Sequence, residues 1–259
     1  MKNLLLILSI ILSLTVSAQE DIKELITDRP DQTESSSVVP TGMLQIESGF
    51  LMEYDEIGSI SEQTLTYNST LLRYGLFNNF ELRAGLEYAK YRKSFGSDVE
   101  DFTGSGMTPF YAGFKIKFLE EDGWIPEAAF LGGISMPFTA DKLFKTSFTS
   151  SDLRFSFGHT LTDKVSLGYN LGMQWDGETG IPGYYYSFAL GRAITDKLSM
   201  YIEAFGLITE KNEAEHLADA GFTFLLAPNL QLDISGGIGL NEEASDSYFG
   251  FGVSYRLPE

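Results

Sequence analysis

The sequence predicts an all-β protein, a transmembrane antiparallel up-and-down β-barrel of about twelve strands with short periplasmic turns and longer extracellular loops. Three observations lead to this prediction. The chain begins like an exported bacterial protein, its later segments alternate apolar and polar side chains, and the connections between those segments alternate in length. Because this combination is typical of bacterial outer-membrane barrels, we expect a protein of the outer membrane of a Gram-negative cell.

The first residues indicate export. Lys2 is followed by an apolar run, Leu4 to Leu12, and by small residues that end at Ala18 before Gln19. This order is typical of a secretory signal peptide, so residues 1–18 are expected to be cleaved. The run is too short for a spanning helix, which needs about 20 apolar residues. An uncleaved membrane anchor is the alternative.

The composition restricts the classes of partner. The formal net charge of −18 over 259 residues would repel nucleic acid and anionic lipid. The absence of cysteine excludes a lipidated N-terminal cysteine and any dependence on disulfides. The 26 glycines, 20 phenylalanines and 13 tyrosines favour sheets in which backbones approach closely.

The strand prediction depends on side chains that alternate between two faces. In segment 165–176, Leu167, Tyr169 and Leu171 fall on one face, whereas Gly168 and Asn170 fall on the other. Successive side chains of a strand point to opposite sides, so one face is suited to lipid and the other to water. About twelve segments show this pattern. They are 43–54, 64–77, 80–92, 109–119, 125–138, 152–162, 165–176, 184–195, 198–209, 216–227, 230–240 and 247–257.

The connections between these segments fall into two groups. The tight ones consist of turn-forming residues. They are Asn78-Asn79, Asp122-Gly123, Asp163-Lys164, Asp196-Lys197 and Pro228-Asn229. The longer ones are 55–63, 93–108, 139–151, 177–183, 210–215 and 241–246. With both termini in the periplasm, the tight turns are periplasmic and the long loops extracellular. These loops are acidic, which indicates solvated surface or, as the alternative, a funnel for cations.

A soluble β-sandwich is the alternative fold. Its strands usually have about 5 or 6 residues, roughly half the length of these segments. Charged residues such as Arg83, Arg154 and Glu203 stand in the middle of the polar faces. A dry core would not accept such charges unpaired, whereas an aqueous lumen would. The membrane barrel is therefore the prediction.

The lumen is expected to be lined by charged side chains. The predicted channel-lining residues are Glu47, Glu81, Arg83, Glu87, Arg154, Glu203, Asp233 and Arg256. The same register turns Lys115, Lys117 and Glu127 inward, and it turns Arg73 inward if a bulge near Ser69 shifts its strand. Charges of both signs either brace a small barrel by cross-strand pairing or form a transverse field along a pore, and the sequence leaves both open.

The sequence offers little for catalysis. Its two histidines are His159 and His216, and no metalloprotease, P-loop or dinucleotide motif is present. His159 shares the lipid-facing side of its segment with Phe155 and Phe157, and no serine stands two residues after it. His216 neighbours Glu213 and Glu215, for which a solvated acidic loop is favoured over a metal site. We predict no catalytic residue, no metal and no cofactor; a serine, acid or tyrosine beside either histidine would reopen the enzyme alternative.

The chain end suggests one partner in biogenesis. Gly252-x-x-Tyr255-x-Leu257 resembles the C-terminal β-signal read by the outer-membrane insertion machinery, although Pro258-Glu259 follow it and its last apolar residue is not aromatic. We therefore expect this machinery as a partner, together with outer-membrane lipid.

Residues 27–50 carry a family resemblance. They contain Asp28, Arg29, Pro30, Asp31, Thr33, Glu34 and Ser35, then Val39, Pro40, Gly42, Gln45, Glu47, Gly49 and Phe50. This pattern resembles the opening signature of the outer-membrane transporter family labelled "putative MetA-pathway of phenol degradation". The resemblance implies an outer-membrane channel for a small solute of hydrophobic or aromatic character. The rest of the chain resembles the family only as a barrel.

The polar segment 19–42 stands between the signal peptide and the predicted barrel, 43–257. It is too polar for a membrane strand, and it concentrates Asp28, Arg29, Asp31 and Glu34 in a short stretch. We expect it to enter the periplasmic mouth, pair with lumen charges and partly plug the channel. The expected function is passive or facilitated diffusion of a small solute, and the alternative is a non-transporting structural or surface-recognition barrel.

Overall fold

The computed structural model describes residues 24–96, 100–210 and 213–257. The signal peptide predicted for residues 1–18 and the first part of segment 19–42 lie outside these ranges. No helix in the described ranges is long and apolar enough to span a membrane. One short 3-10 turn, Pro137–Thr139, follows a strand.

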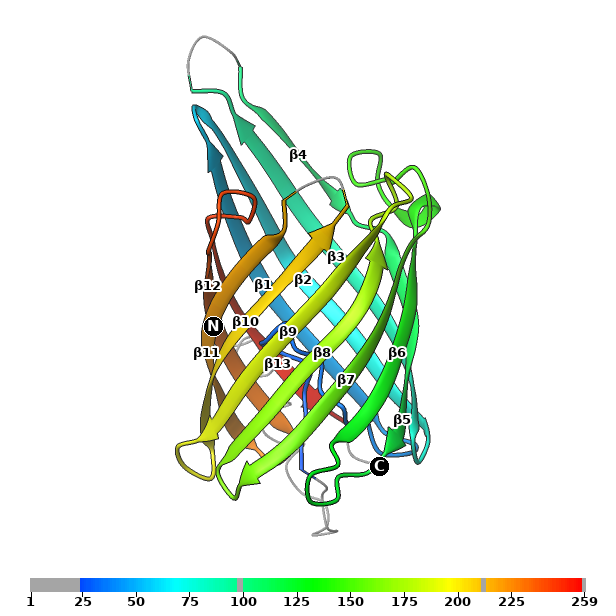
Figure 1. Cartoon of the computed structure of the whole chain (residues 1–259). Helices are drawn as coiled ribbons and strands as arrows, with labels where there is room; N and C mark the ends of the chain where they lie inside the picture. Colours follow the sequence, from blue (N-terminus) through cyan, green and yellow to red (C-terminus); the bar gives the residue numbers. More distant parts are fainter. Residues whose placement is uncertain (1–23, 97–99, 211–212, 258–259) are drawn as a thin grey trace, which may run out of the picture.

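Antiparallel strands form one sheet that closes into a barrel (Figure 1). Closure follows because β1 pairs with β13 on one side and with β2 on the other, and β2 pairs with β3. The strands are β1 (Leu44–Ile57), β2 (Ile60–Phe77), β3 (Phe80–Ser94), β4 (Phe102–Met107), β5 (Phe110–Leu119), β6 (Glu127–Met136), β7 (Ser150–Thr162), β8 (Val165–Trp175), β9 (Pro182–Ala193), β10 (Leu198–Thr209), β11 (Glu215–Ala227), β12 (Leu230–Gly239) and β13 (Ser247–Arg256).

The barrel wall has twelve strands because β4 and β5 occupy one position in it. β3 pairs with β5 over Phe80–Gly85 and with β4 over Tyr88–Lys93. The two strands thus continue one another along β3, and the interruption falls at Thr108-Pro109, where proline has no N–H to donate. The predicted fold class, a twelve-stranded outer-membrane barrel, is confirmed.

The two faces of the wall differ as the alternation predicts. On β12, Leu232 and Ile234 lie on the outer face and are 43% and 45% exposed. Gln231 and Asp233, which alternate with them, lie on the inner face and are 5% and 6% exposed. Aromatic rings of neighbouring strands touch on the outside, as Phe114, Phe130 and Phe155 do across β5, β6 and β7. Lipid contains no water to which backbone N–H and C=O groups could hydrogen-bond. Only a sheet whose strands all pair on both sides satisfies these groups.

Two predicted loops contain strand. β1 and β2 continue into 55–63 and leave only Gly58-Ser59 as the turn, where Gly58 adopts a φ of 66°. Segment 93–108 contains β4. Figure 1 shows β1 to β4 rising beyond the other strands at the extracellular end. The prediction failed here because this extension stands outside lipid, so its strands need no apolar face.

Two further local features bear on the site. A bulge interrupts the pairing of β2 with β3 between Thr66 and Asn68, close to the bulge considered near Ser69. As a result Arg73 faces the lumen and is 1% exposed. The connection from β5 to β6, residues 120–126, is longer than the predicted tight turn and is held by an Asp122–Ile125 bridge.

The lipid-facing surface gives a first prediction. Replacing Ile234 with arginine places a charge against hydrocarbon near the middle of β12, which should lower the free energy of unfolding by about 2–4 kcal/mol. Urea titration of the protein refolded into lipid vesicles measures this. The matched control is Trp124→Arg in the β5–β6 connection, where the side chain is 95% exposed. Equal effects of the two substitutions would contradict the assigned lipid face.

Candidate functional site

The N-terminal segment, residues 24–43, runs through the lumen. Its contacts reach strands all around the wall: Arg29 reaches Asp233 on β12, Thr33 reaches Ser187 on β9, and the backbone N–H of Val39 donates to Glu81 on β3. Figure 1 shows this part of the chain, in blue, enclosed by the strands. The segment enters β1 beside the end of β2, next to the periplasmic turn, so these contacts lie in the periplasmic half of the barrel.

Asp28 is the centre of the charged network on one side of the lumen. Its carboxylate lies 3.0 Å from Arg73, 2.7 Å from Arg83 and 2.9 Å from Lys115. Ser35 also donates to Asp28 through both its backbone N–H and its hydroxyl, which folds the segment back on itself. All three cations are fully buried, so each needs a nearby anion to offset its lost hydration.

The barrel wall alone does not balance these cations. Arg73 pairs with Glu47 at 2.8 Å and Glu81 at 2.9 Å, which braces β1, β2 and β3. Three cations therefore face two wall carboxylates. The segment adds Asp28 and also Glu34, whose carboxylate lies 2.8 Å from Arg83. A buried charge without a partner is strongly unfavourable, so the wall itself attracts this segment.

The opposite wall is acidic. Glu203, Asp219 and Asp233 face the lumen from β10, β11 and β12, and all are buried. The segment presents Arg29 to Asp233 at 2.9 Å, and the backbone N–H of Gln32 donates to Glu203. Asp31 lies near Glu203 and Asp219 and makes no ion pair with the described residues. The charges thus both brace the barrel and form a field across it, the two alternatives that the sequence left open.

Glycines leave room for the segment. The guanidinium of Arg29 lies against Gly49 and Gly252, which pair across β1 and β13, and a side chain at either position would collide with it. Gly75 likewise accommodates the backbone of Val39 and Pro40. These contacts explain why glycine and charge are combined in residues 27–50.

The remaining predicted residues lie apart from this network. Arg256 donates to the backbone carbonyl of Glu24 at the periplasmic end. Glu87 accepts a hydrogen bond from Ser69 farther toward the extracellular end. Lys117 pairs with Glu120 at the periplasmic rim, and Glu127 accepts hydrogen bonds from Ser36 and Ser37. Arg154 faces the lumen from β7 and stacks on the ring of Tyr185.

Sequence reasoning missed a set of aromatic side chains inside the barrel, which we call the lumen aromatics: Tyr111, Tyr185, Tyr201, Phe205 and Tyr248. The hydroxyl of Tyr185 donates to the backbone carbonyl of Gln32, and Tyr201 and Tyr248 both donate to Asp219. The alternation of side chains along each strand could have placed these residues on the inward face. It was hidden because aromatic residues such as Tyr184 and Tyr186 alternate with Tyr185 on the outer face.

Both histidines meet a tyrosine on the outer surface. The Tyr186 hydroxyl lies 2.6 Å from Nδ1 of His216, and the Tyr169 hydroxyl lies 3.4 Å from Nε2 of His159. The His159 and Tyr169 rings also stack, with centroids 5.9 Å apart. Each tyrosine is a group that would reopen the enzyme alternative. In the described ranges neither histidine ring hydrogen-bonds to a serine or a carboxylate, and Glu121, whose charge acts on His159, accepts hydrogen bonds from Thr160. No group of three or more potential ligands there is arranged to hold a metal ion.

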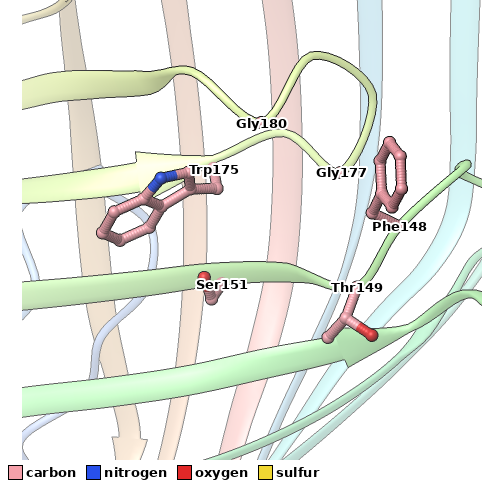
Figure 2. A pocket seen from close by; sticks show the side chains of 6 residues that line it. All are labelled: Phe148, Thr149, Ser151, Trp175, Gly177 and Gly180. Atoms are coloured by element: carbon pink, nitrogen blue, oxygen red, sulfur yellow. The ribbon is translucent and has the colours of Figure 1, made fainter.

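Hollows also occur on the outer wall. One has a volume of about 250 Å³. Figure 2 shows Trp175 at one end of it and Phe148 at the other, with Thr149 and Ser151 on the same segment as Phe148. An apolar hollow of about 400 Å³ adjoins it and shares Ser151 and Trp175. Ser151 belongs to the outward-facing series of β7 that includes Leu153 and Phe155, so these hollows face lipid or the outer rim, not the lumen.

A closed twelve-stranded barrel with an apolar outside and a charged interior defines an outer-membrane β-barrel protein. The chain belongs to the family described as "Putative MetA-pathway of phenol degradation", whose model matches residues 27–257. The suspected family is thereby confirmed, and the match extends far beyond the opening signature. A comparison with curated proteins found no match.

Solved structures share the fold. The COG4313 outer membrane channel from Pseudomonas putida F1 is 10% identical, with a TM-score of 0.68 over 88% of this chain and 100% of that one. The KdgM porin is 10% identical, with a TM-score of 0.53 over 83% and 99%. The translocator domain of the autotransporter NalP from Neisseria meningitidis is 13% identical, with a TM-score of 0.54 over 85% and 90%. These likenesses support the barrel fold.

The charge network gives a second prediction. Asp28→Asn leaves three buried cations short of one carboxylate, so the free energy of unfolding should fall by about 3–5 kcal/mol. The segment should also become sensitive to added protease in folded barrels. Both are measured on protein refolded in detergent micelles.

The control for this prediction is Asp31→Asn in the same segment. Because Asp31 lies among carboxylates, loss of its charge should leave stability unchanged or raise it. If both substitutions destabilise the protein equally, the ion pairs of Asp28 do not hold the segment.

Proposed function

We propose that this protein is an outer-membrane channel through which a small hydrophobic or aromatic solute crosses by passive or facilitated diffusion. The observation that carries the proposal is the lumen itself, where the lumen aromatics stand among charged and hydrogen-bonding side chains. Aromatic rings provide apolar contact while their hydroxyls remain bonded, which suits a solute that is apolar in part. The family description refers to phenol degradation, and one relative of the same fold is described as an outer membrane channel.

In this proposal the N-terminal segment controls the periplasmic half of the lumen. Side-chain ion pairs and hydrogen bonds provide most of its contacts with the wall, and backbone pairing is confined to its end, where Gly42 donates to Gly75. The segment can therefore shift without breaking the ladder that closes the barrel. Solute would enter at the extracellular end, meet the lumen aromatics and leave when the segment moves. The proposal includes no cofactor and no covalent step.

A non-transporting barrel is the second candidate. It is favoured by the pairing of the buried charges around Asp28, because a lumen filled by paired charges needs no solute to explain it. The two candidates differ in what removal of the segment should do. A channel should open further, whereas a structural barrel should mainly lose stability.

Deletion of residues 20–40 gives the third prediction. We expect single-channel conductance in planar bilayers to rise severalfold and selectivity to shift toward anions. The reason is that Arg73, Arg83 and Lys115 then face water without Asp28 and Glu34. Unchanged conductance together with unchanged barrel stability would contradict the plug.

Solute passage gives the fourth prediction. Liposome-swelling rates with graded sugars, amino acids and charged simple aromatics should show that aromatic solutes pass faster than sugars of equal size. The control is Phe205→Ala, which removes one lumen aromatic and should reduce this preference without lowering sugar rates. If no solute passes through the intact protein or the deletion variant, the non-transporting barrel is the better description.

A further inference from the structure

A small pocket opens inside the lumen near the extracellular end. It has a volume of about 120 Å³ and is lined by Gln174, Asp176, Thr179, Ile181, Gly183, Leu207 and Thr209. Gln174 and Gly183 pair across β8 and β9, and they belong to the inward-facing series of those strands. Drug-sized ligands need pockets of about 300–1,000 Å³, so this one fits only a small molecule or part of one.

The apolar part of the pocket is provided by Ile181 and Leu207. Its one carboxylate, Asp176, is already engaged, because the backbone N–H groups of Thr179 and Glu178 donate to it. These bonds hold the pKa of Asp176 below its ordinary value and keep the carboxylate directed at its own loop. The pocket is therefore an apolar surface with polar edges.

Arg154 lies farther from the extracellular end than the pocket, level with the Gly172–Tyr185 pair instead of the Gln174–Gly183 pair. Arg154 pairs with Gly172, Gly172 pairs with Tyr185, and Tyr185 pairs with Leu207, so these residues form a row across β7 to β10. Leu207 belongs to both the row and the pocket. A Cβ at Gly172 would lie 2.8 Å from Cγ of Arg154, so the glycine lets the arginine cross β8. Its Cζ then lies 4.0 Å from the centre of the Tyr185 ring.

Arg154 differs from the other lumen cations. Arg73, Arg83 and Lys115 each pair with carboxylates, whereas in the described part of the chain Arg154 makes no ion pair, and its buried Nε has no hydrogen-bond partner. Stacking on Tyr185 uses the face of the guanidinium and leaves its in-plane N–H groups for another acceptor. The parallel N–H groups of the guanidinium match the two oxygens of a carboxylate.

We infer that Arg154, Tyr185 and the adjoining pocket form a binding site for a small aromatic carboxylic acid. The carboxylate accepts hydrogen bonds from Arg154, and the ring lies against Tyr185, Leu207 and Ile181. This inference rests on the proposed channel function and narrows it, because it gives the solute a negative charge at one end. Glu203, Asp219 and Asp233 lie on β10, β11 and β12, on the Leu207 side of the site, so the carboxylate is favoured at the Arg154 end, on β7.

The test compares benzoate with benzamide, which share a ring and differ in charge. Their dissociation constants are measured by ligand-observed NMR on the full mature barrel in detergent micelles. The intact protein should bind benzoate about tenfold more tightly than benzamide, the size expected for hydrogen bonds to a charged group. Arg154→Gln should reduce this ratio to near one without weakening benzamide binding. The control Arg92→Gln, at an exposed position of the β3 extension, should keep the ratio.

A second variant works in the opposite direction. Asp152 lies on the same face of β7 as Arg154, and its charge interacts with that arginine. Asp152→Asn should therefore raise the preference for benzoate. This variant keeps Arg154, so it tests the site even if Arg154→Gln fails to fold.

The inference is overturned if the intact protein binds both probes equally, if Arg154→Gln keeps the benzoate preference, or if Asp152→Asn lowers it. Competition by chloride at equal concentration would also overturn it, because the site would then hold a simple anion. These outcomes are separable from failure of the channel proposal. Passage of aromatic solutes with no benzoate preference contradicts only this site, whereas absence of any passage contradicts the channel.

Discussion

The whole structure depends on a closed backbone ladder in hydrocarbon. Lipid provides no hydrogen bonds, so every strand must pair on both sides, and the sheet has to join β1 to β13. Closure assigns one face of each strand to lipid and the other to an interior that admits polar groups. Once Arg73, Arg83 and Lys115 are directed inward, their charges need partners in the same confined space. The N-terminal segment supplies Asp28 and Glu34.

The segment and the wall are therefore complementary in charge. The basic wall of β2, β3 and β5 contacts Asp28 and Glu34, and the acidic wall of β10 to β12 contacts Arg29 and backbone N–H groups of the segment. Because opposite walls contact different residues, the segment has one favourable orientation. Its contacts are mainly side-chain interactions, so they contribute to stability without being part of the backbone ladder that closes the barrel. In the channel that we propose, the segment shifts while this ladder stays intact.

Glycine and aromatic residues shape the lumen beyond the charges. Gly49 and Gly252 provide the space in which Arg29 lies, and Gly172 provides the path by which Arg154 reaches Tyr185. In each case the missing side chain leaves room for an arginine side chain. The same alternation that turns Tyr184 and Tyr186 to lipid turns Tyr185 inward, so one strand contributes to both the membrane surface and the interior.

The sequence by itself determined the fold class, the approximate strand positions and the inward direction of the charges. The reason is that side chains of a strand alternate between its two faces, so the order of apolar and polar residues shows the face of each one. It also indicated that the polar segment would meet lumen charges. It did not determine the length of β1 to β4 outside lipid, where hydrogen bonding continues without an apolar face. Only the tertiary structure decided which charges pair, that Arg154 stacks on Tyr185, and that five aromatic side chains face the lumen. Those contacts join residues far apart in the chain, and they depend on strand register and on a bulge beside Tyr67 that the sequence suggested only as a condition for Arg73.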